Sequence, residues 1–208
     1  MGSRGRAAAL AAVLVTLGFT TSGCTGEDEP ERTSGVDPAW YDAVDEAVAD
    51  ADGVGEVPVL SRGSCPLDTP VIAGEELDGS ADVGVSTLGD SGHRLICGWS
   101  PPATDLVVTR FEDPAELDLA REEVARLGEQ DNGANVQTTT AVTVGEREIF
   151  VRRTVFPTND THIDYAAWYL DDDGGGMVLL DVEAGDERDL IDDYDAQQAA
   201  EDLAALLS

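Results

Sequence analysis

The chain has 208 residues, of which 43 are acidic and 12 are basic, so its formal net charge is −31. Every basic residue is an arginine, and the chain has no lysine. This charge excludes a nucleic-acid binder and a protein held electrostatically on anionic lipid, since both polyanions would repel it. A hydrophobic content of 42% is too high for a disordered acidic chain, so a folded domain is expected.

Residues 1–23 are typical of an export signal. Arg4 and Arg6 precede an apolar stretch of 13 residues from Ala7 to Phe19. A helix of that length rises only about 20 Å, which is too short for a hydrocarbon core of about 30 Å, so a signal peptide is favoured over a membrane span. Because Gly5 separates the two arginines, the twin-arginine pattern is absent and the general secretory route is expected.

The segment from Thr21 to Cys24, Thr-Ser-Gly-Cys, resembles a bacterial lipobox, although Thr21 stands where that motif usually has leucine. The resemblance implies that a diacylglycerol is attached to Cys24, which becomes the mature N-terminus and anchors the protein at the outer face of the cell membrane. Two acyl chains suffice for stable anchoring. The alternative is an ordinary secreted protein with an unmodified Cys24. Loss of Arg4 and Arg6 on cleavage takes the formal charge from −31 to −33, so anchoring owes nothing to basic residues.

The acid-rich stretch 24–35 has no apolar periodicity and is predicted to be a solvated tether, although a disordered remnant with no spacing role fits the same composition. Residues 36–208 are one domain by length. Asp37 as N-cap, Pro38 at the first helical position and Gly53 beyond the end predict the first helix. A short strand is predicted at 56–60 and a helix at 67–77.

Two cysteines remain for the exported domain, and in an oxidising exterior we expect a disulfide between Cys65 and Cys97. The chain has no C-x-x-C motif for redox chemistry or zinc. Residues 94–100 alternate with Leu95, Cys97 and Trp99 on one face, which predicts a strand that carries the disulfide beside a tryptophan. Closing a 33-residue loop stabilises the fold by about 3 to 4 kcal/mol on the chain-entropy model.

The second half predicts alternating strands and helices. A strand is predicted at 106–111, followed by a helix whose N-cap is Asp113. This helix has an apolar stripe from Leu117 to Leu127 and is expected to end at Gly128. A four-strand antiparallel meander is then predicted at 136–144, 147–156, 162–170 and 177–184. Its central strands are apolar on both faces, so we expect both faces of the sheet to be covered, and a C-terminal helix is predicted at 190–207. The fold class is therefore α+β, with a mainly antiparallel sheet covered by helices.

The lipobox, the acidic tether, the Ile96-Cys97-Gly98-Trp99 segment and the C-terminal helix rich in alanine and leucine together resemble small secreted lipoproteins of actinobacteria with uncharacterised domains. The resemblance covers most of the chain. Related lipoproteins carry α/β/α sandwiches of the PsbP-like kind, which a sheet covered on both faces would suit. The family brings no established catalytic residues, so the resemblance implies no chemistry.

Motifs for catalysis or metal binding are weak. The nucleophile elbow Gly-x-Ser-x-Gly is absent, and the types of residue in Asp90-Ser91-Gly92-His93 do not by themselves define a triad. His93 and His162 have no zinc-ligand spacing and are predicted to be surface or capping side chains. The acidic run 171–176 resembles the start of a calcium loop, yet Val182 stands where the bidentate acid is required, so a hairpin turn is predicted.

Two charged runs remain. Asp192, Asp193 and Asp195 are predicted to mark a helix start, where the helix dipole favours acids. Arg152 and Arg153 are adjacent in a strand and therefore face opposite ways, so they do not form one anion site.

From these motifs together we expect no enzyme, no metal and no cofactor, and predict a non-catalytic binding or interaction module whose partner is a protein or a small molecule. The alternative is a cell-surface hydrolase with an unrecognised active site.

Overall fold

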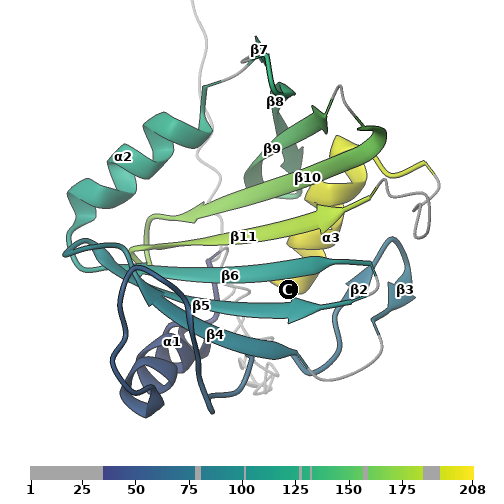
Figure 1. Cartoon of the computed structure of the whole chain (residues 1–208). Helices are drawn as coiled ribbons and strands as arrows, with labels where there is room; N and C mark the ends of the chain where they lie inside the picture. Colours follow the sequence, from purple (N-terminus) through teal and green to yellow (C-terminus); the bar gives the residue numbers. More distant parts are fainter. Residues whose placement is uncertain are drawn as a thin grey trace, which may run out of the picture. The chain divides into compact units, whose positions relative to one another are not determined.

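The computed structural model describes residues 35–77, 81–100, 102–126, 128–131, 133–156, 159–184 and 193–208. Its main feature is a nine-stranded antiparallel sheet in the order β1-β4-β5-β6-β11-β10-β9-β8-β7 (Figure 1). The strands of this sheet are β1 (Val59–Leu60), β4 (Asp82–Thr87), β5 (Gly92–Trp99), β6 (Thr104–Phe111), β7 (Gly128–Asp131), β8 (Val136–Val144), β9 (Arg147–Phe156), β10 (Asn159–Asp171) and β11 (Gly176–Glu183). The described helices are α1 (Pro38–Asp50), α2 (Pro114–Val124) and α3 (Ala196–Leu206).

The sheet consists of two meanders joined side by side. Strands β4 to β6 form the first and β7 to β11 the second, and they meet where residues 104–110 of β6 pair with residues 176–182 of β11. The mainly antiparallel α+β class is confirmed, as are the four strands of the predicted meander. Strands β4 and β7 were not predicted, because Gly84 interrupts the apolar pattern of β4 and β7 is the fully exposed Gly-Glu-Gln-Asp.

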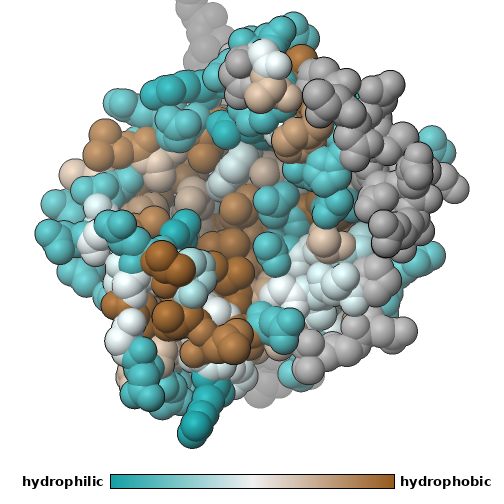
Figure 2. All heavy atoms as spheres, viewed as in Figure 1, coloured by the Kyte–Doolittle hydropathy of each residue, from teal (hydrophilic) through white to brown (hydrophobic). Residues whose placement is uncertain are grey.

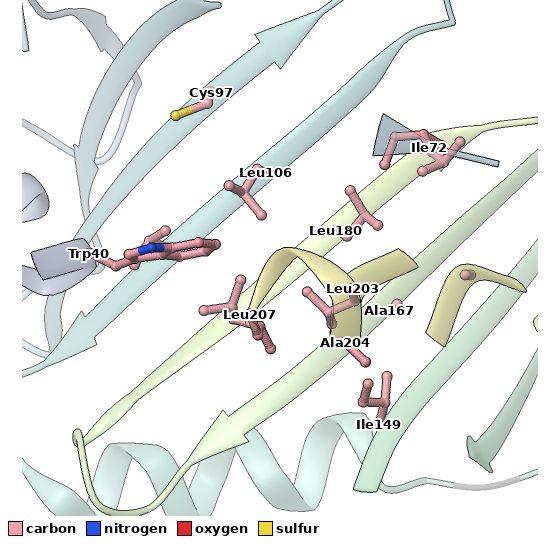
Figure 3. Close-up of a cluster of buried hydrophobic side chains, with 14 of the residues drawn as sticks. Trp40, Ile72, Cys97, Leu106, Ile149, Ala167, Leu180, Leu203, Ala204 and Leu207 are labelled. Carbon is pink, nitrogen blue, oxygen red and sulfur yellow. The ribbon is translucent and has the colours of Figure 1, made fainter. Parts of the chain in front are cut away.

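Helices α1 and α3 cover one face of the sheet, α1 over β4 to β6 and α3 over β8 to β11. Trp40, Tyr41, Val44 and Ala47 are the buried residues of α1. Figure 3 shows Leu203 of α3 and Leu207, the C-cap residue after this helix, lying over the strands, in the same cluster as Trp40. These side chains and the inward residues of the strands form the main hydrophobic core.

Each helix begins where the sequence provides an aspartate cap. The carboxylates of Asp37, Asp113 and Asp195 accept hydrogen bonds of 2.9 Å from the backbone N–H groups of Ala39, Ala115 and Gln198. These side chains satisfy donors that a helix N-terminus leaves free. Helix α2 ends at Val124, before the Gly128 stop that the sequence suggests, and Gly128 instead begins β7 with a positive φ of 104°.

Two predicted elements differ in the structure. The prediction of a helix at 67–77 is wrong, because this segment contains the hairpin of β2 (Val71–Ile72) and β3 (Glu75–Glu76). Its turn needs left-handed backbone at Ala73 and Gly74, whose φ values are 52° and 82°, and a continuous helix cannot accommodate that conformation. The expected strand at 56–60 is reduced to the two residues of β1.

The C-terminal helix starts at Ala196, later than predicted, and residues 185–192 lie outside the described ranges. Tyr194, expected inside this helix, lies just before its N-cap and is buried.

The disulfide between Cys65 and Cys97 is confirmed, with a Cα–Cα distance of 5.9 Å. Cys97 is buried on the same face as Leu95 and Trp99, as the alternation predicts. The predicted signal peptide, Cys24 and the tether up to residue 34 lie outside the described residues.

The other face of the sheet carries α2, which covers only part of it (Figure 1). Leu117 and Val124 of α2 pack on Phe150, Trp168 and Leu170 to form a second, smaller hydrophobic cluster. The expectation that both faces are covered therefore holds for the meander half, where α2 and α3 lie on opposite sides. On the half formed by β4 to β6, α2 contacts β6 on the face opposite α1, whereas α1 contacts all three strands on its own face.

Candidate binding surface

The sheet face that carries α2 presents a line of apolar residues across the strands. Directly paired residues in an antiparallel sheet share a face, so the pairing register gives the order of side chains along such a line. We call the part of this line beyond α2 the apolar row; it consists of Leu60, Gly84, Ile96, Val107 and Leu179. Leu179 also touches the cluster under α2, so the row begins at the edge of that cluster.

The apolar row is incompletely packed. Ile96 and Val107 are half-buried and belong to neither of the hydrophobic clusters formed by the described residues. Leu60, at the other end of the row, is 84% exposed, and Val57 in the segment before it is 76% exposed. Figure 2 shows apolar residues gathered on this face. A contiguous apolar area of this kind is a recognised mark of an interaction surface.

Carboxylates occupy the next line of side chains on the same face. We call Asp82, Asp105 and Asp181 the acidic row; Gly98 lies between the first two and completes the register across β4, β5, β6 and β11. A Cβ on Gly98 would lie 2.9 Å from Oδ1 of Asp105, so glycine at this position leaves room for the carboxylate. Asp105 and Asp181 are direct cross-strand neighbours, an arrangement that is unfavourable for like charges.

Burial disfavours the charged forms of Asp105 and Asp181, and neighbouring charges add to this effect at Asp181. Burial raises the pKa of Asp181 to about 6, and the charges of Asp164, Asp105 and Glu183 contribute to the increase. Burial also raises the pKa of Asp105, and it raises the pKa of Asp164 despite the opposing effect of His162. Carboxylates with raised pKa values that lie close together are a physical indication of a functional site.

His162 bridges two acids at the edge of this group. Its Nδ1 lies 3.0 Å from Oε1 of Glu183 and its Nε2 lies 3.3 Å from Oδ1 of Asp164, and these two acids are themselves cross-strand neighbours. The imidazole also packs against Phe156, with ring centroids 4.8 Å apart. The side chain of His162 is partly exposed, so its contacts with the two acids do not contradict the predicted surface or capping role. No described arginine forms an ion pair with Asp105, Asp164 or Asp181.

The residues singled out for chemistry do not converge. His93 lies on β5, with Nδ1 3.9 Å from Oε1 of Glu112. Arg152 and Arg153 face opposite ways, as predicted, and Arg152 stacks over Trp168 at 5.0 Å while its Nε donates a 3.3 Å hydrogen bond to Thr139. The stretch after Asp171 forms the predicted turn between β10 and β11. Within the described residues, no three His, Cys, Asp or Glu side chains are placed to hold a metal ion.

Sequence reasoning missed the apolar and acidic rows. The local signal exists, because Asp105 and Val107 alternate on β6, as Leu179 and Asp181 do on β11. The alternation does not reveal that β6 pairs with β11, because these two strands belong to different meanders and are far apart in sequence. Only that pairing places Asp105 opposite Asp181 and Val107 opposite Leu179.

No protein-family model, curated protein or solved structure gives a significant match to the chain. In the part of the chain that the structure describes, no helix is both long and apolar enough to cross a bilayer.

Proposed function

We propose that the protein is a cell-envelope lipoprotein whose domain is a non-catalytic binding module. In this proposal, residues 1–23 direct export by the general secretory route and a lipid on Cys24 holds the protein at the outer face of the cell membrane. The observation that carries the binding role is the apolar row, where Ile96 and Val107 remain half-buried beside a line of carboxylates. A sheet face that served only stability would be covered, as the opposite face is by α1 and α3.

The layer order supports a finer proposal about the fold. With α1 and α3 on one face of the sheet and α2 on the other, the domain suits an α/β/α sandwich of the PsbP-like kind. In that arrangement the α2 layer is incomplete over β4 to β6, and the gap coincides with the apolar row.

The anchor is tested by expressing the full-length chain in a bacterium that processes lipoproteins. We expect protein in the membrane fraction, with an intact mass that corresponds to cleavage before Cys24 plus an acylated cysteine. The Cys24→Ala chain should be found in the soluble envelope fraction or the medium. An unmodified Cys24 in the wild-type protein would contradict the anchor.

The binding role is tested by placing a photo-crosslinking amino acid at Val107 in cells. A matched chain carries the same amino acid at Asp50, which is exposed on α1 over the opposite face. We expect discrete adducts from position 107 and none from position 50. Identical adduct patterns from both positions, or no adduct from position 107, would argue against a binding surface on this face.

A further inference from the structure

We propose that the apolar and acidic rows together bind a basic amphipathic helix of a partner protein. This inference rests on the proposed binding function and specifies the partner's chemistry. It starts from the shape of the surface: the apolar row runs across the strands from Leu60 on β1 to Leu179 on β11. Contact with the face of a sheet is made by side chains, since the backbone groups of the inner strands are already paired within the sheet.

The length of the row fits a helical segment. Five neighbouring strands, spaced about 4.8 Å apart, give a row of about 19 Å. A helix rising 1.5 Å per residue covers that distance in about 13 residues, and an apolar stripe at i, i+3 and i+4 would follow the row. Helices already cover the sheet in this way, with α1 and α3 on the opposite face and α2 beside the row (Figure 1).

The acidic row selects the sign of the partner's charge. Side chains two residues apart on a strand lie about 6.6 Å apart, so Asp105 and Asp181 flank Val107 and Leu179 along one side of the row. Lysine or arginine side chains on one flank of a helix seated over the row would reach these carboxylates. A cation there would relieve the repulsion between Asp105 and Asp181, which have no arginine partner among the described residues.

The same charges disfavour other occupants. A second copy of this chain would bring another acidic row toward Asp105 and Asp181, and the chain's net charge of −31 opposes such an approach. Anionic lipid would be repelled for the same reason. A small polycation could pair with the acidic row but would leave Ile96, Val107 and Leu60 uncovered.

The inference is tested with the purified full-length chain in detergent micelles and a labelled synthetic helix of about 14 residues. The peptide carries leucines in a stripe that would follow the row and lysines along one flank, and a permuted peptide of the same composition lacks the stripe. At about 150 mM salt, we expect the striped peptide to bind at least about 10-fold more tightly than the permuted one. Fluorescence anisotropy provides the dissociation constants.

Matched variants assign the binding to this face. The double substitution D105N/D181N should weaken binding about 10-fold, whereas D50N/E129Q, which removes the same charge from exposed positions elsewhere, should change it less than about 2-fold. Ile96→Gln should weaken binding about 5-fold, and Leu119→Gln, at an apolar α2 residue that is 58% exposed, should have little effect. Circular dichroism verifies that each variant is folded.

The inference is overturned if the two double variants behave alike, if the permuted peptide binds as well as the striped one, or if spermidine displaces the peptide at equal concentration. It is also overturned if anionic vesicles or self-association, measured by flotation and sedimentation, involve these residues instead. The Cys24→Ala chain should bind the peptide as the wild type does. If the wild-type chain carries no lipid but binds the peptide through Asp105 and Asp181, only the proposed anchor is contradicted. If the lipidated chain binds the peptide equally well with and without these two carboxylates, only this inference is contradicted.

Discussion

The hydroxyl of Tyr41 in α1 donates a 2.9 Å hydrogen bond to Oδ2 of Asp171, which lies 130 positions later at the end of β10. Both residues are buried. The glycines after Asp171 make room for the tyrosine, because a Cβ on Gly174 would lie 2.5 Å from its Cε2 and a Cβ on Gly176 would lie 2.3 Å from its Cε1. The acidic, glycine-rich turn therefore has a packing role, which is to seat α1 against the β10–β11 hairpin.

Tyr41→Phe should destabilise the protein by about 1 to 3 kcal/mol, since it removes the closest donor to a buried carboxylate. Among the described residues, the carboxylate of Asp171 also accepts a 3.4 Å hydrogen bond from the backbone N–H of Val36. Tyr194→Phe is the matched control. It removes a 3.0 Å bond to Asp202, which keeps donors from Ala73 at 2.9 Å and Gln198 at 2.8 Å.

Urea unfolding of the two variants decides the comparison. We expect Tyr41→Phe to lower the free energy of unfolding more than Tyr194→Phe, because Asp202 retains two short hydrogen bonds. An equal or larger loss for Tyr194→Phe would show that the Asp171 contact does not hold α1 in place.

Gly176→Ala should destabilise the protein by more than about 2 kcal/mol. The added methyl group would lie 2.3 Å from the Tyr41 ring and 2.6 Å from the carbonyl oxygen of Thr109, so the buried ring or the strand backbone would have to shift. Gly55→Ala is the control, because a Cβ there meets nothing within 4 Å and its effect should stay within about 0.5 kcal/mol. Thermal unfolding distinguishes the two, and similar melting temperatures would refute the close packing of Tyr41.

Local patterns predicted the elements whose signals are contained in a short stretch of sequence. Asp37-Pro38 and Asp113-Pro114 give the starts of α1 and α2, and turn residues separate the strands of the meander. The hairpin at 71–76 was mistaken for a helix because its turn depends on a positive φ at Ala73. The Asp202 carboxylate of α3 supports this turn by accepting a hydrogen bond from the Ala73 N–H. That contact is 129 positions distant in sequence, so no local pattern reveals it.

The candidate surface was even less predictable than the fold. Each acid of the acidic row is one of 43 acidic residues in the chain, so the sequence does not show which of them form a functional pair. Asp105 and Asp181 become neighbours only through the β6–β11 register, which depends on how two meanders meet. The Cys65–Cys97 pairing was predictable because the expected export signal implies an oxidising environment and the third cysteine was assigned to the expected lipobox.

Reduction of the disulfide should lower the free energy of unfolding by about 3 to 4 kcal/mol, as the chain-entropy model gives for a loop of this size. The measurement compares urea unfolding of the oxidised protein with that of protein kept reduced by a phosphine, with thiol labelling of Cys65 and Cys97 to verify each state. Cys97 is fully buried, so labelling should require unfolding. Equal unfolding midpoints in both states would contradict a structural role.

Asp181 of the acidic row should make the protein less stable as the pH rises from about 4 to about 7. The pKa of Asp181 is raised from 3.8 to about 6 in the folded state, so the folded protein retains a proton that the unfolded chain has already released. Ionisation of Asp181 therefore costs stability across this range, by at most about 3 kcal/mol. Ordinary acid denaturation opposes this trend in the whole protein, so the effect is measured as the difference between a variant and the wild type.

Asp181→Asn isolates this contribution, because the amide keeps the shape of the side chain and cannot ionise. Its gain in unfolding free energy over the wild type should be small at about pH 4, where both side chains are neutral, and should rise through about pH 6 to a plateau. Asp50→Asn, which changes an exposed acid, should stay within about 0.5 kcal/mol of the wild type. A gain for Asp181→Asn that is independent of pH would mean that Asp181 ionises in the folded protein as it does in the unfolded chain, and the repulsion inferred for the acidic row would then be absent.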